Sequence, residues 1–117
     1  MRVRWTRRAR NDVVEIFEHI IKENRLAAAR EYMRIREAAE GLADFPFSGR
    51  AVPEFPHPGI RQKIVRPYRI VYLVAEDASE VQLLTVLHTR QQWPPTMDGG
   101  NDEGVEREDD EPGDEPE

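Results

Sequence analysis

The first half of the chain places apolar residues with the period of an α-helix. One apolar stripe runs over residues 7–24 among arginines and glutamates, and a second runs over residues 26–43. The stripes consist of Ala9, Val13, Ile16, Phe17, Ile20 and Ile21, and of Ala28, Tyr32, Ile35, Ala39 and Leu42. Asn24 and Arg25 form a short turn between them, so the two helices are predicted to pack as an antiparallel hairpin.

Patterns typical of strands lie on both sides of this hairpin. Residues 3–5 alternate apolar side chains with arginine and predict a short edge strand, after which Thr6 can cap the first helix. Further strands are expected at residues 60–66, 68–75 and 81–89, separated by a turn at Pro67 and a loop at residues 76–80. The last two strands are apolar on both faces, which indicates a central position in the sheet.

Residues 45–59 contain four prolines and two glycines, which predicts a structured connector rather than a flexible linker. The complete order is therefore β-α-α-β-β-β. This order predicts one α+β domain over residues 1–96. In it, the helix hairpin covers one face of an antiparallel sheet and the other face is partly open.

Charge is distributed unevenly along the chain. Residues 97–117 carry eleven acidic side chains against one arginine, whereas residues 1–96 carry sixteen Lys and Arg against twelve Asp and Glu. We expect residues 97–117 to form a disordered tail, because they contain too few apolar side chains to offset the entropy of ordering. The tail is either a solubilising segment or a polyanion that folds back on the basic body and competes with nucleic acid or a partner.

The body of the domain, with a net charge of about +4, favours an anionic partner. Its first segment holds a basic cluster that could contact nucleic acid or be neutralised by acidic residues of a partner or of the tail. This cluster consists of Arg2, Arg4, Arg7, Arg8 and Arg10.

Several classes of protein are excluded or disfavoured by composition. The sequence has no cysteine, which excludes a disulfide framework, a thiolate metal site and a cysteine nucleophile. His19, His57 and His88 are too scattered to indicate a metal site, and we expect no cofactor. No apolar stretch approaches the roughly 20 residues of a membrane span, and no apolar segment follows the basic start as in a signal peptide. We therefore expect a cytoplasmic protein.

Four motifs after the helices occur in an order and spacing that resemble the RelE/ParE toxin family of type II toxin-antitoxin systems. They are FPFSGR at 45–50, HPGIR at 57–61, PYRIVYLV at 67–74 and VLHTRQ at 86–91. The similarity covers residues 2–94. It implies a growth inhibitor, associated with plasmid stabilization, that pairs with a small antitoxin which usually also binds operator DNA.

The resemblance implies two possible targets. Members of the branch that resembles RelE cut messenger RNA in the ribosomal A site, and members of the branch that resembles ParE poison DNA gyrase. The PxxGR motif, followed by PGIR and YRIVY, is closer to the ParE-like branch. Fold alone does not decide between the two activities.

RNA cleavage without a metal requires a base for the 2′-hydroxyl, cations around the phosphorane and an acid for the leaving oxygen. In RelE-like nucleases the catalytic basic residues lie on the strands, and by motif position they correspond here to Arg61, Lys63, Arg69 and Arg90. Arginine suits phosphate because its forked donors match phosphate oxygens. His88 suits proton transfer because a histidine side chain titrates near neutral pH.

Structural roles remain open for these residues. Arg69 shares a strand face with Val71 and Leu73, and it could close an ion pair at the sheet edge instead of contacting phosphate, antitoxin or gyrase. Arg90 shares strand parity with His88, so the two could line one surface. His88 could equally be a packed or solvent-facing histidine without a role in proton transfer.

Arg61 and Lys63 could form a solvated edge that resists aggregation. After residue 90 the chain departs from the nuclease pattern, because QQWPP replaces the short helix whose tyrosine commonly completes RelE-like sites. Trp93 could stack on a base or cap the core. Gly49 and Arg50 are expected to shape the connector, the glycine through a positive φ and the arginine by satisfying nearby carbonyls or a carboxylate.

The leading hypothesis from sequence is a non-enzymatic toxin that inhibits DNA gyrase and is neutralised by a cognate antitoxin. The antitoxin is expected to lay an amphipathic helix and an extended segment over the open sheet face and the helix hairpin. The alternative is a ribosome-dependent mRNA endonuclease that uses the basic residues named above. A second alternative is an inactive family member that only binds partners.

Overall fold

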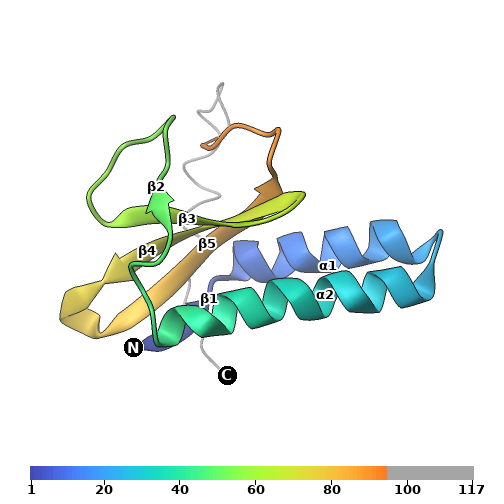
Figure 1. Ribbon diagram of the computed structural model, residues 1–117, viewed down its shortest axis with the longest axis horizontal. Coiled ribbons are helices and arrows are strands. Elements are labelled where there is room, and N and C mark those ends of the chain that lie inside the picture. Colours follow the sequence, from blue (N-terminus) through green and yellow to red (C-terminus); the bar gives the residue numbers. More distant parts are fainter. Residues whose placement is uncertain (95–117) are drawn as a thin grey trace.

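The elements of the computed structural model follow the predicted order, with one additional short strand in the connector (Figure 1). They are β1 (Arg2–Trp5), α1 (Arg7–Ile21), α2 (Arg25–Glu40), η1 (Gly41–Ala43), β2 (Arg50–Ala51), β3 (Ile60–Val65), β4 (Tyr68–Ala75), η2 (Glu76–Ala78) and β5 (Glu80–His88). The structure describes residues 1–94. The acidic segment 97–117, for which we predicted disorder, lies outside the described residues.

The two long helices begin at side-chain caps. Thr6 Oγ1 accepts a hydrogen bond from Ala9 N (3.2 Å) and donates one to Leu83 O (2.6 Å), so this buried hydroxyl both caps α1 and ties it to β5. Asn24 Oδ1 accepts a hydrogen bond of 2.9 Å from Ala27 N in the first turn of α2. Because an N-cap residue has extended backbone, Asn24 cannot belong to α1 as we predicted, and α1 ends at Ile21.

The strand order β1-β5-β4-β3-β2 places β4 in the centre and β1 and β2 at the edges. The antiparallel meander predicted for β3, β4 and β5 is confirmed. The prediction of a wholly antiparallel sheet is wrong, because β1 runs parallel to β5 with Val3 opposite Val81. Alternation of apolar and polar residues specifies which side chains share a face, but it carries no information about strand direction.

Each face of the sheet carries its own apolar core. The larger one lies between the sheet and the helices, and it includes Ala9, Val13, Ile35, Ala39, Leu42, Val65, Ile70, Tyr72, Val74, Val81, Leu83 and Val86. The smaller one, on the opposite face, is built from Val52, Ile60, Val71 and Leu87, with Phe55 and Trp93 packed against it. The second face is therefore covered by the connector and by Trp93, and is less open than we predicted.

Asp12 anchors α1 to the sheet at a β-bulge that the sequence did not indicate. The register of β4 against β5 shifts after Val71. At this position Asp12 Oδ2 accepts hydrogen bonds from Thr85 Oγ1 (2.5 Å) and Val86 N (3.1 Å). Burial raises the pKa of Asp12, and the two hydrogen bonds only partly oppose this effect.

The far end of the helix hairpin extends beyond the sheet (Figure 1). The apolar stripes of α1 and α2 also pack on each other, with the rings of Phe17 and Tyr32 in edge contact at 6.2 Å between centroids. Tyr32, which we placed in the apolar stripe, keeps 37% of its surface exposed. Within residues 1–94, no helix has the length and apolar character needed to cross a membrane.

Candidate functional site

The five residues considered for catalysis do not converge on one place. Arg69 is buried on the face of the sheet opposite the helices, and Arg90 is exposed in the turn after β5. Both line a shallow depression beside the connector. Arg61 and Lys63 lie on the other face of the sheet, and His88 is at the end of β5.

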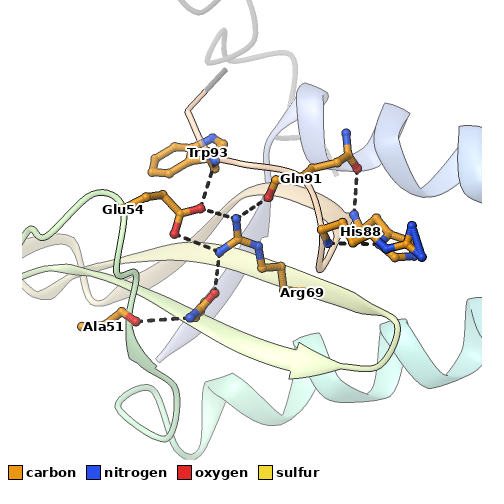
Figure 2. Close-up of polar contacts among 8 residues, drawn as sticks. Ala51, Glu54, Arg69, His88, Gln91 and Trp93 are labelled. Carbon is orange, nitrogen blue, oxygen red and sulfur yellow. Dashed lines mark hydrogen bonds and ion pairs between the residues drawn. The ribbon is translucent and has the colours of Figure 1, made fainter. Parts of the chain in front are cut away.

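Arg69 uses its guanidinium inside the protein (Figure 2). Its Nη2 pairs with the Glu54 carboxylate and donates to Gln91 O at 2.6 Å, while its Nη1 donates to Gln62 Oε1 at 2.7 Å. The side chain is 6% exposed. Its Nε is buried without a hydrogen-bond partner among residues 1–94. Arg69 therefore joins the centre of the sheet to the connector and to the segment after β5, and its terminal donors are already engaged.

Glu54 is the acceptor around which this cluster is organised. Besides the ion pair with Arg69, it accepts a bond of 3.1 Å from Trp93 N, so one carboxylate holds both the central strand and the end of the described chain. The hydrogen bond from Arg69 lowers the pKa of Glu54, with help from Trp93 N and against the opposing effect of burial. The ion pair that we named as the structural alternative for Arg69 is present, although it lies over a central strand and not at the sheet edge.

The pKa of Glu54 leads to a stability prediction. Because this pKa is lower in the folded than in the unfolded chain, the stabilisation is fully present above the unfolded value of about 4.3 and is lost as the pH falls through the folded value. We expect the difference in unfolding free energy between wild type and Glu54→Gln to be constant from about pH 7 to about pH 5 and to shrink below about pH 4.5. Urea unfolding of both proteins across this pH range measures the difference. A free-energy difference that does not change with pH contradicts a lowered pKa for Glu54.

Arg90 and His88 do not line one surface, contrary to the prediction from strand parity. Strand β5 ends at His88, and the residues after it form a turn in which Gln91 N donates to His88 O at 2.9 Å. His88 Nδ1 accepts a bond of 3.1 Å from Arg90 N, and its ring lies edge-on to Tyr68 at 6.0 Å between centroids. Alternation therefore stops at His88, whose imidazole helps to close the turn.

Arg61 and Lys63 face the helix side of the sheet. Arg61 is opposite Tyr72 and Lys63 is opposite Ile70, and both of these partners belong to the helix-side core. Arg61 Nη1 donates to Gly49 O at 2.8 Å, and Lys63 Nζ is 3.4 Å from an acceptor, the hydroxyl of Ser48. The sheet thus separates these two side chains from Arg69.

The FPFSGR segment is held by the buried hydroxyl of Tyr72, which sequence reasoning missed. Tyr72 Oη accepts a bond from Gly49 N (2.9 Å) and donates one to Pro46 O (2.9 Å). Gly49 does not have the positive φ that we predicted; it is required because a Cβ there would lie 2.4 Å from Gln62 O. Arg50 is exposed on β2, and the carbonyl of the neighbouring Gly49 accepts a hydrogen bond from Arg61.

The N-terminal arginines take part in holding β1 on the sheet. Glu80 accepts hydrogen bonds from Arg2 (3.1 Å), Arg4 (3.2 Å) and Gln82 (2.9 Å). Burial acts to raise the pKa of Glu80, but these hydrogen bonds together outweigh it and hold the pKa below its usual value. Arg10 donates to Trp5 O at 3.3 Å. This cluster is at least partly structural.

A groove of about 710 Å³ lies between the edge strand β1 and the helices. Its apolar lining comes from Val3, Trp5, Val13, Val14 and Tyr32. Charged side chains line it as well: Arg2, Arg4, Arg10, Arg36 and Glu40. An apolar floor beside an edge strand suits an amphipathic segment of a partner, either as a helix in the groove or as an added strand.

Sequence reasoning missed Glu54, Gln62 and Tyr72, which organise the two polar clusters. Glu54 follows Pro53 in the proline-rich connector, where no period assigns a side chain to a face. Gln62 is a polar residue between two cations on an apparent edge strand. No group of three His, Asp or Glu side chains within residues 1–94 is arranged to hold a metal ion.

Comparison with known proteins shows consistent similarity. Residues 3–93 match the family model of the ParE toxin of the type II toxin-antitoxin system parDE. The chain is 41% identical over 103 residues to Y4kP of Sinorhizobium fredii, a presumed toxin, with 82% of this chain and 96% of the relative covered. It is 36% identical over 85 residues to toxin RelE2 of Caulobacter vibrioides, with 72% of this chain and 90% of the relative covered.

Solved structures show the same fold. A chain of the chromosomal ParDE system from P. aeruginosa superimposes with a TM-score of 0.64 and 24% identity, over 75% of this chain and 95% of the other. A chain of the RelBE2 toxin-antitoxin complex from Mycobacterium tuberculosis superimposes with a TM-score of 0.56 and 23% identity, over 74% and 95%. One fold thus spans systems named for both branches.

Proposed function

The chain belongs to the ParE toxin family of type II toxin-antitoxin systems, and from this premise we propose that it is a growth inhibitor acting on DNA gyrase through protein contacts. A cognate antitoxin neutralises it. The proposal requires no catalytic group on this chain. It assigns the chain a surface for its target and a second surface for its antitoxin.

The observation that carries the proposal is the placement of the basic residues. A metal-independent ribonuclease needs several cations and a proton donor around one phosphate. Here Arg69 is paired with Glu54, Arg61 and Lys63 lie across the sheet from it, and His88 closes a turn. This arrangement supports binding over RNA cleavage.

The groove beside β1 is the site we assign to the antitoxin. Its apolar lining can bury one face of an amphipathic helix, and β1 has an outer edge to which an extended segment can pair. The arginines that line the groove favour acidic side chains on that segment. We expected the antitoxin to cover the open sheet face and the helix hairpin. The groove includes the helices, but the sheet face is replaced by the edge of β1, since the connector and Trp93 cover that face.

The test is to induce the full chain without antitoxin and to follow DNA supercoiling and pulse-labelled protein synthesis in the same cells. We expect gyrase-cleaved DNA and altered supercoiling to appear early, while protein synthesis continues. Co-expression of the antitoxin encoded beside the toxin serves as the control and should restore growth.

Two other outcomes contradict the proposal. Immediate translation arrest with A-site mRNA cuts would establish the mRNA endonuclease, with Arg69 and Arg90 as its first candidates beside Arg61, Lys63 and His88. The similarity to a relative named toxin RelE2 is the observation that favours testing for mRNA cleavage. Normal growth after induction would favour an inactive member that only binds partners.

A further inference from the structure

Two phenylalanine rings project from the segment between α2 and β2. Phe45 keeps 69% of its surface exposed and Phe47 keeps 48%. Phe17 and Phe55, by contrast, pack against other rings. Exposing two large apolar side chains so close together is unfavourable in water, and exposed apolar clusters commonly mark interaction sites.

The backbone that carries these rings is fixed to the core. Phe45 N donates to Gly41 O at 3.1 Å, and Ser48 N donates to Phe45 O at 3.1 Å. Tyr72, which is fully buried, holds Pro46 and Gly49 through its hydroxyl. The rings are therefore presented on a constrained loop, and a partner would not have to order this segment on binding.

Basic side chains lie beside this segment. The Arg61 guanidinium lies 4.9 Å from the centroid of the Phe47 ring, Lys63 Nζ contacts Ser48, and Arg50 is exposed on β2. Neither residues 45–51 nor strand β3 contains an acidic residue. We call this surface, made of Phe45, Phe47, Arg50, Arg61 and Lys63, the aromatic-basic edge.

We propose that the aromatic-basic edge is the surface through which the toxin engages its protein target, and that the target offers an apolar recess bordered by carboxylates. Aromatic residues and arginine on a constrained loop are typical binding hot spots. The basic side chains of the edge favour an acidic border, although the exposed Asp44 precedes Phe45. This inference rests on the proposed function and adds to it the location of the target contact.

The edge shares no residue with the groove assigned to the antitoxin. Target and antitoxin would thus contact different side chains of the toxin. Substitutions can therefore separate the two activities, which a single shared surface would not allow.

The geometry favours a protein over single-stranded nucleic acid at this edge. Nucleic acid would use the rings as stacking platforms and the cations for phosphates. Arg61 already covers one face of Phe47, and its Nη1 donates to Gly49 O at 2.8 Å and to Phe47 O at 3.5 Å. Burial of the rings in an apolar recess of a protein does not require a ring face that is free for stacking.

The experiment compares full-length variants for growth arrest in cells and for antitoxin affinity in vitro. Phe45→Ser/Phe47→Ser should lose growth arrest while its Kd for antitoxin stays within about threefold of wild type. Val14→Lys is the matched control, because Val14 is 50% exposed and lines the groove. The Val14→Lys variant should still arrest growth, and its affinity for antitoxin should fall at least about tenfold.

Two substitutions of opposite charge at one position make the test independent of folding. Phe45→Glu and Phe45→Lys remove the same ring from an exposed site, so both should fold. Against an acidic target, Phe45→Glu should impair arrest at least about tenfold more than Phe45→Lys, measured as the inducer concentration that halves growth.

Each result decides between the inferences. A double serine variant that arrests growth like wild type overturns the aromatic-basic edge and leaves the proposed function standing. Loss of arrest together with loss of antitoxin binding overturns the separation of the two surfaces. Arrest through mRNA cuts that the double variant no longer makes would show that the edge reads nucleic acid. A wild-type chain without effect on growth overturns the proposed function itself, and this inference with it.

Discussion

Arg69→Ala should destabilise the protein by about 2–3 kcal/mol, lowering the melting temperature by roughly 10–20 °C. The substitution leaves Glu54 without its cation, and it removes the donors to Gln62 and to the carbonyl of Gln91. Breaking a largely buried ion pair is costly because the remaining partner stays desolvated without compensation. Since Glu54 retains 22% side-chain exposure, we expect a smaller loss than the roughly 3–5 kcal/mol of a fully buried pair. Thermal and urea unfolding measure the effect.

Arg90→Ala is the matched control, because sequence presents Arg69 and Arg90 as equivalent candidates. Arg90 is exposed, so its replacement should change stability by no more than about 0.5 kcal/mol. Equal effects of the two substitutions would show that the Arg69 cluster contributes little to the fold. A loss of toxicity in Arg69→Ala must accordingly be compared with its stability before it is assigned to chemistry.

Gly49→Ala is expected to destabilise by about 3 kcal/mol. A Cβ at this position would lie 2.4 Å from Gln62 O and 2.6 Å from Tyr72 Oη. The loop would have to move away, and the buried Tyr72 hydroxyl would then lose its bonds to Gly49 N and Pro46 O. Urea unfolding should show a lower midpoint with an unchanged slope.

Gly41→Ala provides the comparison for this second substitution. Gly41 has an ordinary helical φ of −64°, and a Cβ there would meet no atom within 4 Å. Alanine should therefore be neutral or stabilise by up to about 1 kcal/mol, through the reduced entropy of the unfolded chain. If both substitutions were neutral, the close approach of Gly49 to β3 would not be required for the fold.

Both predictions depend on contacts that sequence patterns do not reveal. Period and alternation assign a residue to a face of an element, and they placed Arg69 correctly on the face of Val71. They do not identify what lies above that face. Glu54 comes from a connector without any period, so its pairing with Arg69, fifteen positions later in the chain, depends on how the residues between them fold.

The sequence by itself determined the order of the main elements and the family. The apolar stripes specify the helix hairpin, Thr6 specifies where its first helix begins, and the doubly apolar strands specify the centre of the sheet. These features are local, so neighbouring residues suffice to encode them. The motifs from residue 45 onward identified the toxin family.

Only the tertiary structure decided the direction of β1, the covering of the second sheet face and the separation of the basic residues. Each of these depends on contacts between segments far apart in the chain, such as Arg2 with Glu80 or Arg69 with Gln91. Strand parity predicted one surface for His88 and Arg90, but a turn begins directly after His88 and ends the alternation. The pattern of a sequence reports which residues are buried, whereas the folded chain decides which polar groups meet, because those partners come from different elements.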